Sequence, residues 1–133
     1  GKPQTFEFLG FTHICSRKRN GKFTVLRRTI KRRMRAKLLE IKQELRRRLH
    51  DPVPVVGRWL RSVVRGHINY YGVPRNEHAV GLFCAEVSRL WYRSLRRRSQ
   101  KTRLNWRRMG RLVKKWIPNA RAVHPYPEQR LRV

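Results

Sequence analysis

From residue 30 onward, apolar side chains recur every three or four positions, and this spacing limits the possible folds more than any other feature. Such spacing places side chains on one face of an α-helix. The first stripe consists of Ile30, Met34, Leu38, Ile41, Leu45 and Leu49. The second consists of Val56, Trp59, Val63 and His67 or Ile68, and the third of Val80, Phe83, Cys84, Val87, Leu90, Trp91 and Leu95. Three helices joined by short loops bury such stripes against one another, which predicts a compact three-helix bundle.

Helix-breaking and helix-capping residues divide the stripes. The first helix is expected to end near His50-Asp51-Pro52. Pro54 suits the first turn of the second helix, because its missing N–H has no partner there. Gly72 marks the end of the second helix, and Asn76 is a suitable N-cap for the third.

The first 29 residues have the composition of β-structure. Thr5 to Cys15 and Phe23 to Arg28 are rich in aromatic and β-branched residues. Between them, Asn20-Gly21 suits a type I′ turn because both residues tolerate positive φ. Residues 1–29 are therefore predicted to form a β-hairpin with a cationic tip. Because a strand-like segment begins almost at once, the chain is interpreted as part of a longer protein.

A fourth, shorter helix is predicted after a linker at Gln100 to Leu104. Asn105 is positioned to cap it and Pro118 to stop it. One face of this helix holds Trp106, Met109, Leu112 or Val113, and Trp116. The residues after it lack helical periodicity and are expected to form an extended tail. The predicted fold is thus mainly α: a hairpin over 1–29, three helices over 30–101, and a basic helix with a tail over 102–133.

Positive charge dominates the whole sequence. Thirty-five Lys and Arg residues stand against seven Asp and Glu, for a formal net charge of +28 in 133 residues and a pI of about 11.9. This balance is unusual for soluble enzymes and typical of proteins that bind nucleic acids. Because so many cations repel one another, the native state is expected to be a complex with a polyanion.

The sequence gives no sign of a membrane partner or of an oxidising compartment. No apolar run approaches the roughly 18 residues that a membrane-spanning helix needs, and no signal peptide is recognisable. Cys15 and Cys84 are far apart and belong to no Cys-x-x-Cys or paired-histidine motif. A soluble, intracellular chain with buried thiols is therefore favoured over one with a disulfide or a metal site.

Catalytic chemistry fits the sequence poorly. General acid–base and two-metal catalysis need clustered carboxylates, whereas the seven here are scattered, and Glu40 and Glu44 suit i, i+4 pairing with nearby cations. The five histidines share no spacing. No catalytic residue and no metal ligand is therefore assigned, and the chain alone is not expected to be an enzyme.

Nucleic-acid binding fits the sequence well. Lys and Arg that neutralise phosphates release counterions, and the guanidinium group pairs with phosphate and stacks on bases. Any single cation in such a run is as often part of a solvated face. The candidate nucleic-acid contacts are Arg17, Lys18, Arg19, Lys22, Lys31, Arg32, Arg35, Lys42, Arg46, Tyr71, Arg93, Arg96, Arg97, Arg98, Lys101, Arg107, Arg108, Arg111, Lys114 and Lys115.

Aromatic residues offer a second means of binding, by stacking on unpaired bases. The candidates are Tyr70, Tyr71, Trp106 and Trp116. Aromatic residues at helical spacing more often belong to the core, and three are assigned to it: Trp59, Phe83 and Trp91. Of the tandem tyrosines, one ring is expected to be buried and the other exposed. Trp106 is expected to anchor its helix by packing.

Several strings resemble one family, the reverse transcriptases encoded by group II introns. Three strings resemble the last conserved block of its polymerase domain: Pro3-Gln4-Thr5, Phe8-Leu9-Gly10-Phe11 and Asn20-Gly21-Lys22-Phe23. The family also has a maturase-specific region, called domain X, which doubles as the thumb. Three further strings resemble this region: Gly66 to Gly72 (GHINYYG), Arg97 to Gln100 (RRSQ) and Leu104-Asn105-Trp106. His124 to Pro127 (HPYP) resembles a C-terminal string of bacterial members. The resemblance spans nearly the whole chain.

This resemblance implies a function within a larger protein. The intact protein is expected to reverse-transcribe RNA and to bind its own intron RNA during splicing and mobility, as a cytoplasmic, bacterial-type component of a ribonucleoprotein or the nucleoid. The Mg²⁺-binding aspartates belong to an upstream Tyr-x-Asp-Asp motif that this chain lacks, so no cofactor is expected here. The expected partners are the intron RNA, the RNA template–DNA primer duplex, target DNA and the rest of the polymerase domain.

Two other interpretations share the basic composition. One is a structural RNA-binding protein resembling a ribosomal protein, in which basic helices hold folded RNA together. The other is the thumb of a retron, diversity-generating or CRISPR-associated reverse transcriptase. The strings Phe8 to Phe11 and Tyr70 to Gly72 favour the maturase.

Overall fold

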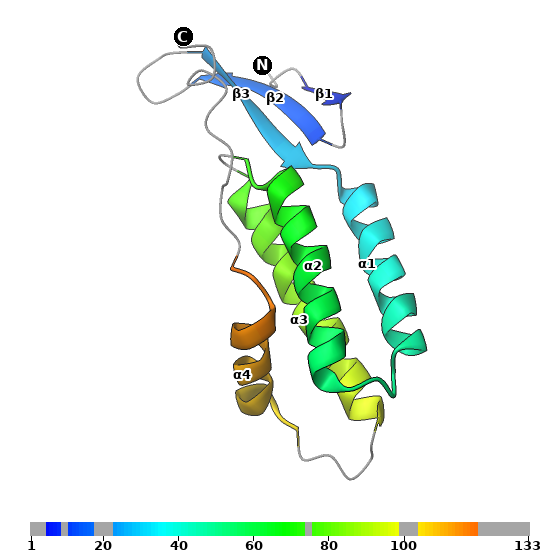
Figure 1. Ribbon diagram of the computed structural model, residues 1–133. Helices are drawn as coiled ribbons and strands as arrows, with labels where there is room; N and C mark the ends of the chain where they lie inside the picture. Colours follow the sequence, from blue (N-terminus) through cyan, green and yellow to red (C-terminus); the bar gives the residue numbers. More distant parts are fainter. Residues whose placement is uncertain (1–4, 9–10, 18–22, 74–75, 99–103, 120–133) are drawn as a thin grey trace.

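The computed structural model describes residues 5–8, 11–17, 23–73, 76–98 and 104–119, with side chains from Ile30 onward. Within these ranges the elements follow the order β1 (Thr5–Phe8), β2 (Phe11–Arg17), β3 (Phe23–Thr29), α1 (Lys31–Arg47), α2 (Val53–Tyr71), α3 (Glu77–Arg98) and α4 (Trp106–Trp116). The helices stand together below a small sheet (Figure 1). The prediction of a mainly helical chain with four helices is confirmed.

The three strands form an antiparallel sheet in the order β1-β2-β3. Strand β2 pairs with β3 from Phe11↔Thr29 to Arg17↔Phe23, and the connection between them lies outside the described residues. The run from Thr5 to Cys15 predicts one strand, but Phe8 pairs with Phe11 and the chain reverses direction between them. Aromatic and β-branched residues continue on both sides of this reversal, so strand propensity does not mark it.

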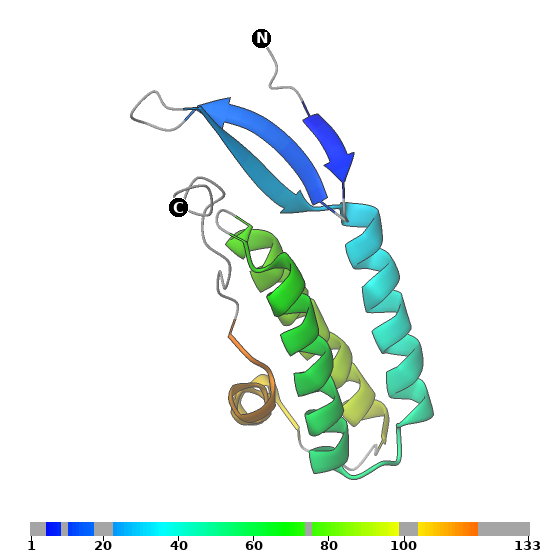
Figure 2. The ribbon, with the colours of Figure 1, turned by 45° about the horizontal axis from the view of Figure 1, so that its top comes forward.

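Helices α1, α2 and α3 bury their apolar stripes in one core. Ile41 and Leu45 contribute from α1, and the α3 stripe is buried most completely, with Val80, Phe83 and Val87 fully inaccessible. Helix α1 packs chiefly against α3 rather than against α2, its neighbour in sequence. In two views α2 and α3 lie between α1 on one side and α4 on the other (Figures 1 and 2).

The buried face of α2 is wider than its predicted stripe. Leu60 and Val64 are completely buried, whereas Trp59 and Val63 are half-buried. The buried face is wide because α2 packs against both α3 and α4. Trp59 keeps a core role, but its ring also meets the guanidinium carbon of Arg48 at 4.7 Å from the ring centroid.

The helix ends agree with most of the capping predictions. Asn105 accepts a hydrogen bond from the backbone N–H of Arg108 at 3.0 Å, as an N-cap of α4 should. Pro54 lies in the first turn of α2. Asn76 precedes α3 and is buried, and its side-chain amide donates to the carbonyl oxygen of Tyr71 at 2.8 Å. Asn76 thereby joins the end of α2 to the start of α3.

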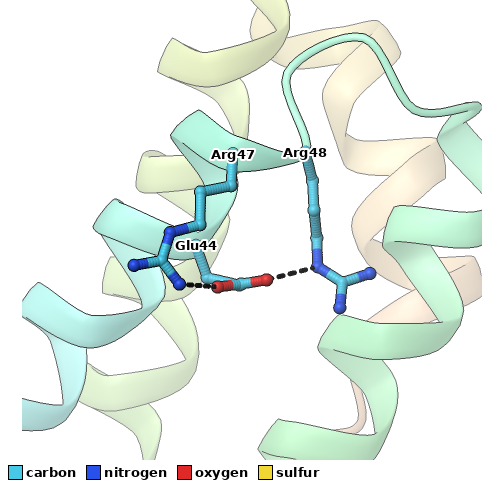
Figure 3. A network of polar contacts seen from close by, with 3 residues as sticks. All are labelled: Glu44, Arg47 and Arg48. Carbon is cyan, nitrogen blue, oxygen red and sulfur yellow. Dashed lines mark hydrogen bonds and ion pairs between the residues drawn. The ribbon is translucent and has the colours of Figure 1, made fainter.

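One carboxylate organises the end of α1. Glu44 accepts from Arg47 at 3.3 Å and from Arg48 at 3.0 Å (Figure 3). The Arg48 guanidinium then lies over Trp59 on α2, so this contact extends from α1 to the neighbouring helix. Arg98, at the end of α3, donates to the carbonyl oxygen of Asp51 at 2.9 Å. The lower ends of α1, α2 and α3 are thus held together by side chains as well as by the core.

Helix α4 docks on α2 through Trp116 and Met109, both buried. The Trp116 ring lies so close to Gly57 that a Cβ added there would be 2.6 Å from the ring. Arg61 supports the contact, because its guanidinium lies 4.8 Å from the ring centroid and donates to the Lys115 carbonyl oxygen at 2.8 Å. Trp116 is therefore the anchor of α4.

The anchoring role predicted for Trp106 is only partly correct. Its side chain is 52% exposed, although its ring stacks on Tyr92 with centroids 4.4 Å apart. Being at the first residue of α4, Trp106 reaches the surface of α3 rather than the core.

Candidate nucleic-acid interface

The predicted contacts divide by where they fall in the structure. Lys18, Arg19, Lys22 and Lys101 lie outside the described residues, and Arg17 belongs to β2, where only the backbone is described. The other cations on the helices are all exposed: Lys31, Arg32, Arg35, Lys42, Arg46, Arg93, Arg96, Arg97, Arg98, Arg107, Arg108, Arg111, Lys114 and Lys115. Exposed cations form a binding surface only where the packing of the helices places them side by side. This is the case for some of these residues.

Four of these cations line one groove between α1 and α3. Lys42 and Arg46 lie one turn apart on α1, and Arg93 and Arg97 lie one turn apart on α3. The groove has a volume of about 200 Å³, and its lining also includes Leu45, Leu49, Leu90 and Ser94. None of the described residues that line it is acidic. We call this the α1–α3 groove. The two rows run side by side because α1 and α3 run in the same direction in the bundle (Figure 1).

Three acids of α1 and α3 are engaged with other cations. Glu40 pairs with Lys37 at 3.3 Å, Glu44 with Arg47 and Arg48, and Glu86 with Arg89. Among the described ion pairs, none involves a cation of the α1–α3 groove. The groove therefore combines four positive charges with apolar side chains at its base. Such an arrangement can contact the phosphates of a nucleic-acid backbone.

The run Arg96-Arg97-Arg98 does not act as one unit. Each helical residue is rotated by about 100° from the one before it. Arg97 lines the groove, Arg98 binds the Asp51 carbonyl oxygen, and the Arg96 guanidinium lies 5.7 Å from the centroid of the Tyr92 ring. Only the middle member of the triplet therefore faces the groove.

The cations of α4 form a separate surface. Arg107, Arg108, Arg111 and Lys114 are exposed on a helix that lies across the bundle from α1 (Figure 2). Lys115 is exposed too, but its ammonium lies 5.2 Å from the centroid of the Trp116 ring and its carbonyl oxygen is bound by Arg61. These residues do not extend the α1–α3 groove.

The tandem tyrosines differ in burial, as expected. Tyr70 is 48% exposed, whereas Tyr71 is half-buried, with its ring centroid 4.6 Å from that of His67. Burial raises the pKa of the Tyr71 phenol. Tyr70 is therefore better placed than Tyr71 to stack on a base, because its ring is more accessible.

Two residues that sequence reasoning did not single out also belong to a cationic surface. Arg33 and Lys37 lie one turn apart on α1 and line a second hollow, which α1 forms with α2. Their i, i+4 spacing was a usable signal, but it does not reveal which helix lies opposite.

Two titratable side chains in the bundle core, His67 and Cys84, are held in their neutral forms. Burial lowers the pKa of His67 to about 4, with a further contribution from the charge of Lys37, so His67 is neutral at pH 7. Burial raises the pKa of the Cys84 thiol to about 11, which keeps it protonated. No group of three or more His, Cys, Asp or Glu among the described residues is placed to hold a metal ion.

The helices that the structure describes include none with the length and apolar character to cross a membrane. No family model, curated protein or solved structure matches the chain.

Proposed function

We propose that this chain binds nucleic acid through the α1–α3 groove. The observation that supports the proposal most directly is the convergence of Lys42, Arg46, Arg93 and Arg97 on one groove whose described lining residues include no acid. These residues belong to two helices separated by about fifty positions, so their meeting is a property of the fold rather than of a local run. A groove of this kind contacts phosphates and reads shape rather than sequence.

We further propose that the chain is the thumb and maturase region of a group II intron-encoded reverse transcriptase. The support is the resemblance of its strings, together with a bundle whose charged helices α1 and α3 face one side. In this function the groove holds the intron RNA or the template–primer duplex. Catalysis and Mg²⁺ binding belong to the polymerase active site of the intact protein, and no residue described here is assigned to them.

Electrostatic binding through the groove predicts a specific salt dependence. We expect the double substitution Arg46→Ala/Arg97→Ala to weaken binding to an RNA duplex. The log–log slope of affinity against salt should become less steep by about 2, because each lost phosphate contact removes about 1. Fluorescence anisotropy with a labelled duplex at several salt concentrations measures both quantities.

A matched control separates the groove from general charge. Arg58→Ala/Arg65→Ala removes the same two charges from exposed positions of α2 that line neither hollow. If both double variants lower affinity equally, binding depends on net charge and the assignment to the groove is wrong. Unchanged helical circular dichroism in both variants shows that the fold is intact.

The maturase assignment has its own test. The full-length protein should accelerate splicing of the group II intron that encodes it, and Arg46→Ala/Arg97→Ala should reduce that acceleration. Tight RNA binding with no effect on splicing would instead favour a structural RNA-binding protein. Reverse transcription without any effect on splicing would favour a retron-like polymerase.

A further inference from the structure

A second hollow lies between α1 and α2, on a different face of α1 from the α1–α3 groove. Its volume is about 530 Å³, within the range of about 300–1,000 Å³ that small-molecule sites occupy. Its lining includes Arg33 and Lys37 from α1 and Gly66, His67 and Tyr70 from α2. We call it the α1–α2 cleft. It exists because α1 packs chiefly on α3 and leaves its α2-facing side less filled.

Aromatic rings form the inner wall of the cleft. His67 stacks on Phe83 with centroids 3.6 Å apart and an angle of 9° between the rings, and the Tyr71 ring centroid lies 4.6 Å from that of His67. Tyr70 meets Tyr71 edge to face at 4.8 Å and is 48% exposed. The cleft therefore offers an accessible aromatic ring next to rings held in place by the core.

His67 also leaves an unmet hydrogen-bonding group at the wall of the cleft. The residue is only 7% exposed, and its Nε2 has no hydrogen-bond partner among the described residues. A buried polar atom without a partner costs about 1–3 kcal/mol.

The rim of the cleft is positive. Arg33 and Lys37 line the cleft together with the aromatic side chains of α2. Glu40 also lines the cleft and pairs with Lys37 at 3.3 Å. Both side chains of that pair are largely exposed, so the pair contributes little and Lys37 can exchange it for another anion.

Gly66 keeps the cleft open. A Cβ added at Gly66 would meet nothing within 4 Å, so the protein itself does not require glycine there. Glycine inside a helix costs about 1 kcal/mol relative to alanine. Without a side chain at Gly66, a ligand in the cleft can approach the backbone of α2 closely.

Together, these features of the α1–α2 cleft indicate which kind of ligand it binds. An accessible ring beside two cations matches the two parts of a nucleotide, because its base stacks on aromatic rings and its phosphate pairs with cations. Building on the proposed nucleic-acid binding, we propose that the α1–α2 cleft takes one unpaired nucleotide of the bound RNA, with its base on Tyr70 and its phosphate between Arg33 and Lys37. The cleft and the α1–α3 groove share α1, because residues of its segment 33–40 line the cleft and its Lys42, Leu45 and Arg46 line the groove.

A comparison of bulged and fully paired RNA tests this inference in the full chain. The two duplexes differ by one unpaired 2-aminopurine, whose fluorescence falls when it stacks. We expect tighter binding of the bulged duplex and quenching of its fluorescence. Tyr70→Ala should abolish the quenching and reduce affinity for the bulged duplex by about 5- to 150-fold. Affinity for the paired duplex should stay unchanged, and Tyr70→Phe should retain both signals.

A second variant fills the cleft without removing a contact. Gly66→Leu places a side chain in the open space, and Gly110→Leu is its control, because a Cβ at Gly110 on α4 also meets nothing within 4 Å. Both should fold, as judged by circular dichroism and thermal unfolding. Only Gly66→Leu should abolish the preference for the bulged duplex.

The outcomes separate this inference from the proposed function. If the chain binds neither duplex, the proposed function itself is wrong. If it binds both duplexes equally well and Tyr70→Ala changes nothing, the proposed function stands and the cleft is not a nucleotide site. If an acidic peptide binds the wild-type chain but not Gly66→Leu while bulged RNA is not preferred, the cleft is a protein-docking site and the nucleotide assignment is overturned.

Discussion

At the scale of single residues, the contact between Gly57 and Trp116 is the least tolerant of change. A methyl group at Gly57 would lie 2.6 Å from the buried indole ring of Trp116. We expect Gly57→Ala to lower the free energy of unfolding by about 1–3 kcal/mol, because overpacking displaces the ring. Gly66→Ala on the same helix should instead raise it by up to about 1 kcal/mol. Denaturant unfolding of both variants measures the difference.

His67 makes stability depend on pH. Its pKa is lowered from 6.5 to about 4 in the folded chain, mainly by burial and further by Lys37. Above pH 6.5 both folded and unfolded chains are neutral at this residue, so its contribution is intact. As pH falls below 6.5, only the unfolded chain takes up the proton, and stability is lost progressively until about pH 4.

The expected loss between about pH 7 and about pH 5 is about 2 kcal/mol, at about 1.4 kcal/mol for each pH unit. His67→Phe retains a ring against Phe83 but cannot titrate. Its free energy of unfolding should therefore change less over this interval. If the variant and the wild-type chain lose stability in parallel, other groups cause the pH dependence.

At the scale of the elements, the end of α1 offers a matched pair of arginines. Arg47 and Arg48 bind the same carboxylate of Glu44, but the Arg47 side chain is 79% exposed and that of Arg48 is 29% exposed (Figure 3). Only Arg48 also covers Trp59 on α2. We expect Arg48→Ala to cost about 1 kcal/mol and Arg47→Ala less than about 0.5 kcal/mol. Equal costs would mean that the contact with Trp59 contributes nothing to the attachment of α1 to α2.

At the scale of the whole molecule, a charge of +28 makes salt act in opposite directions on folding and binding. Salt screens the mutual repulsion of the cations, so moderate salt should raise the thermal unfolding midpoint of the free chain. The same salt weakens nucleic-acid binding, so the extra stabilisation that RNA gives should shrink. Thermal unfolding with and without an RNA duplex measures both trends, and a midpoint of the free chain that falls with salt would contradict the repulsion argument.

The helices were predictable from the sequence because each carries its own apolar period. The stripes of α1 and α3, and the Asn105 cap of α4, depend on local spacing and are found where expected. The meeting of Lys42 with Arg97 is different, because it depends on α1 packing against α3 instead of α2. The separation of Arg96, Arg97 and Arg98 is local instead, because each residue of α3 is rotated by about 100° from the one before it. A run of cations shows charge, whereas the packing decides which of them share a surface.

The junction between the sheet and the bundle is short. Strand β3 ends at Thr29 and α1 begins at Lys31, so Ile30, which is 6% exposed, is the single residue between them. The carbonyl oxygen of Ile30 accepts from the N–H groups of Arg33 and Met34, both at 3.1 Å. A connection of one residue leaves few backbone angles free between the sheet and α1. A tilt of the sheet relative to the bundle would therefore have to be absorbed at Ile30 or passed on to α1, which lines both the groove and the cleft.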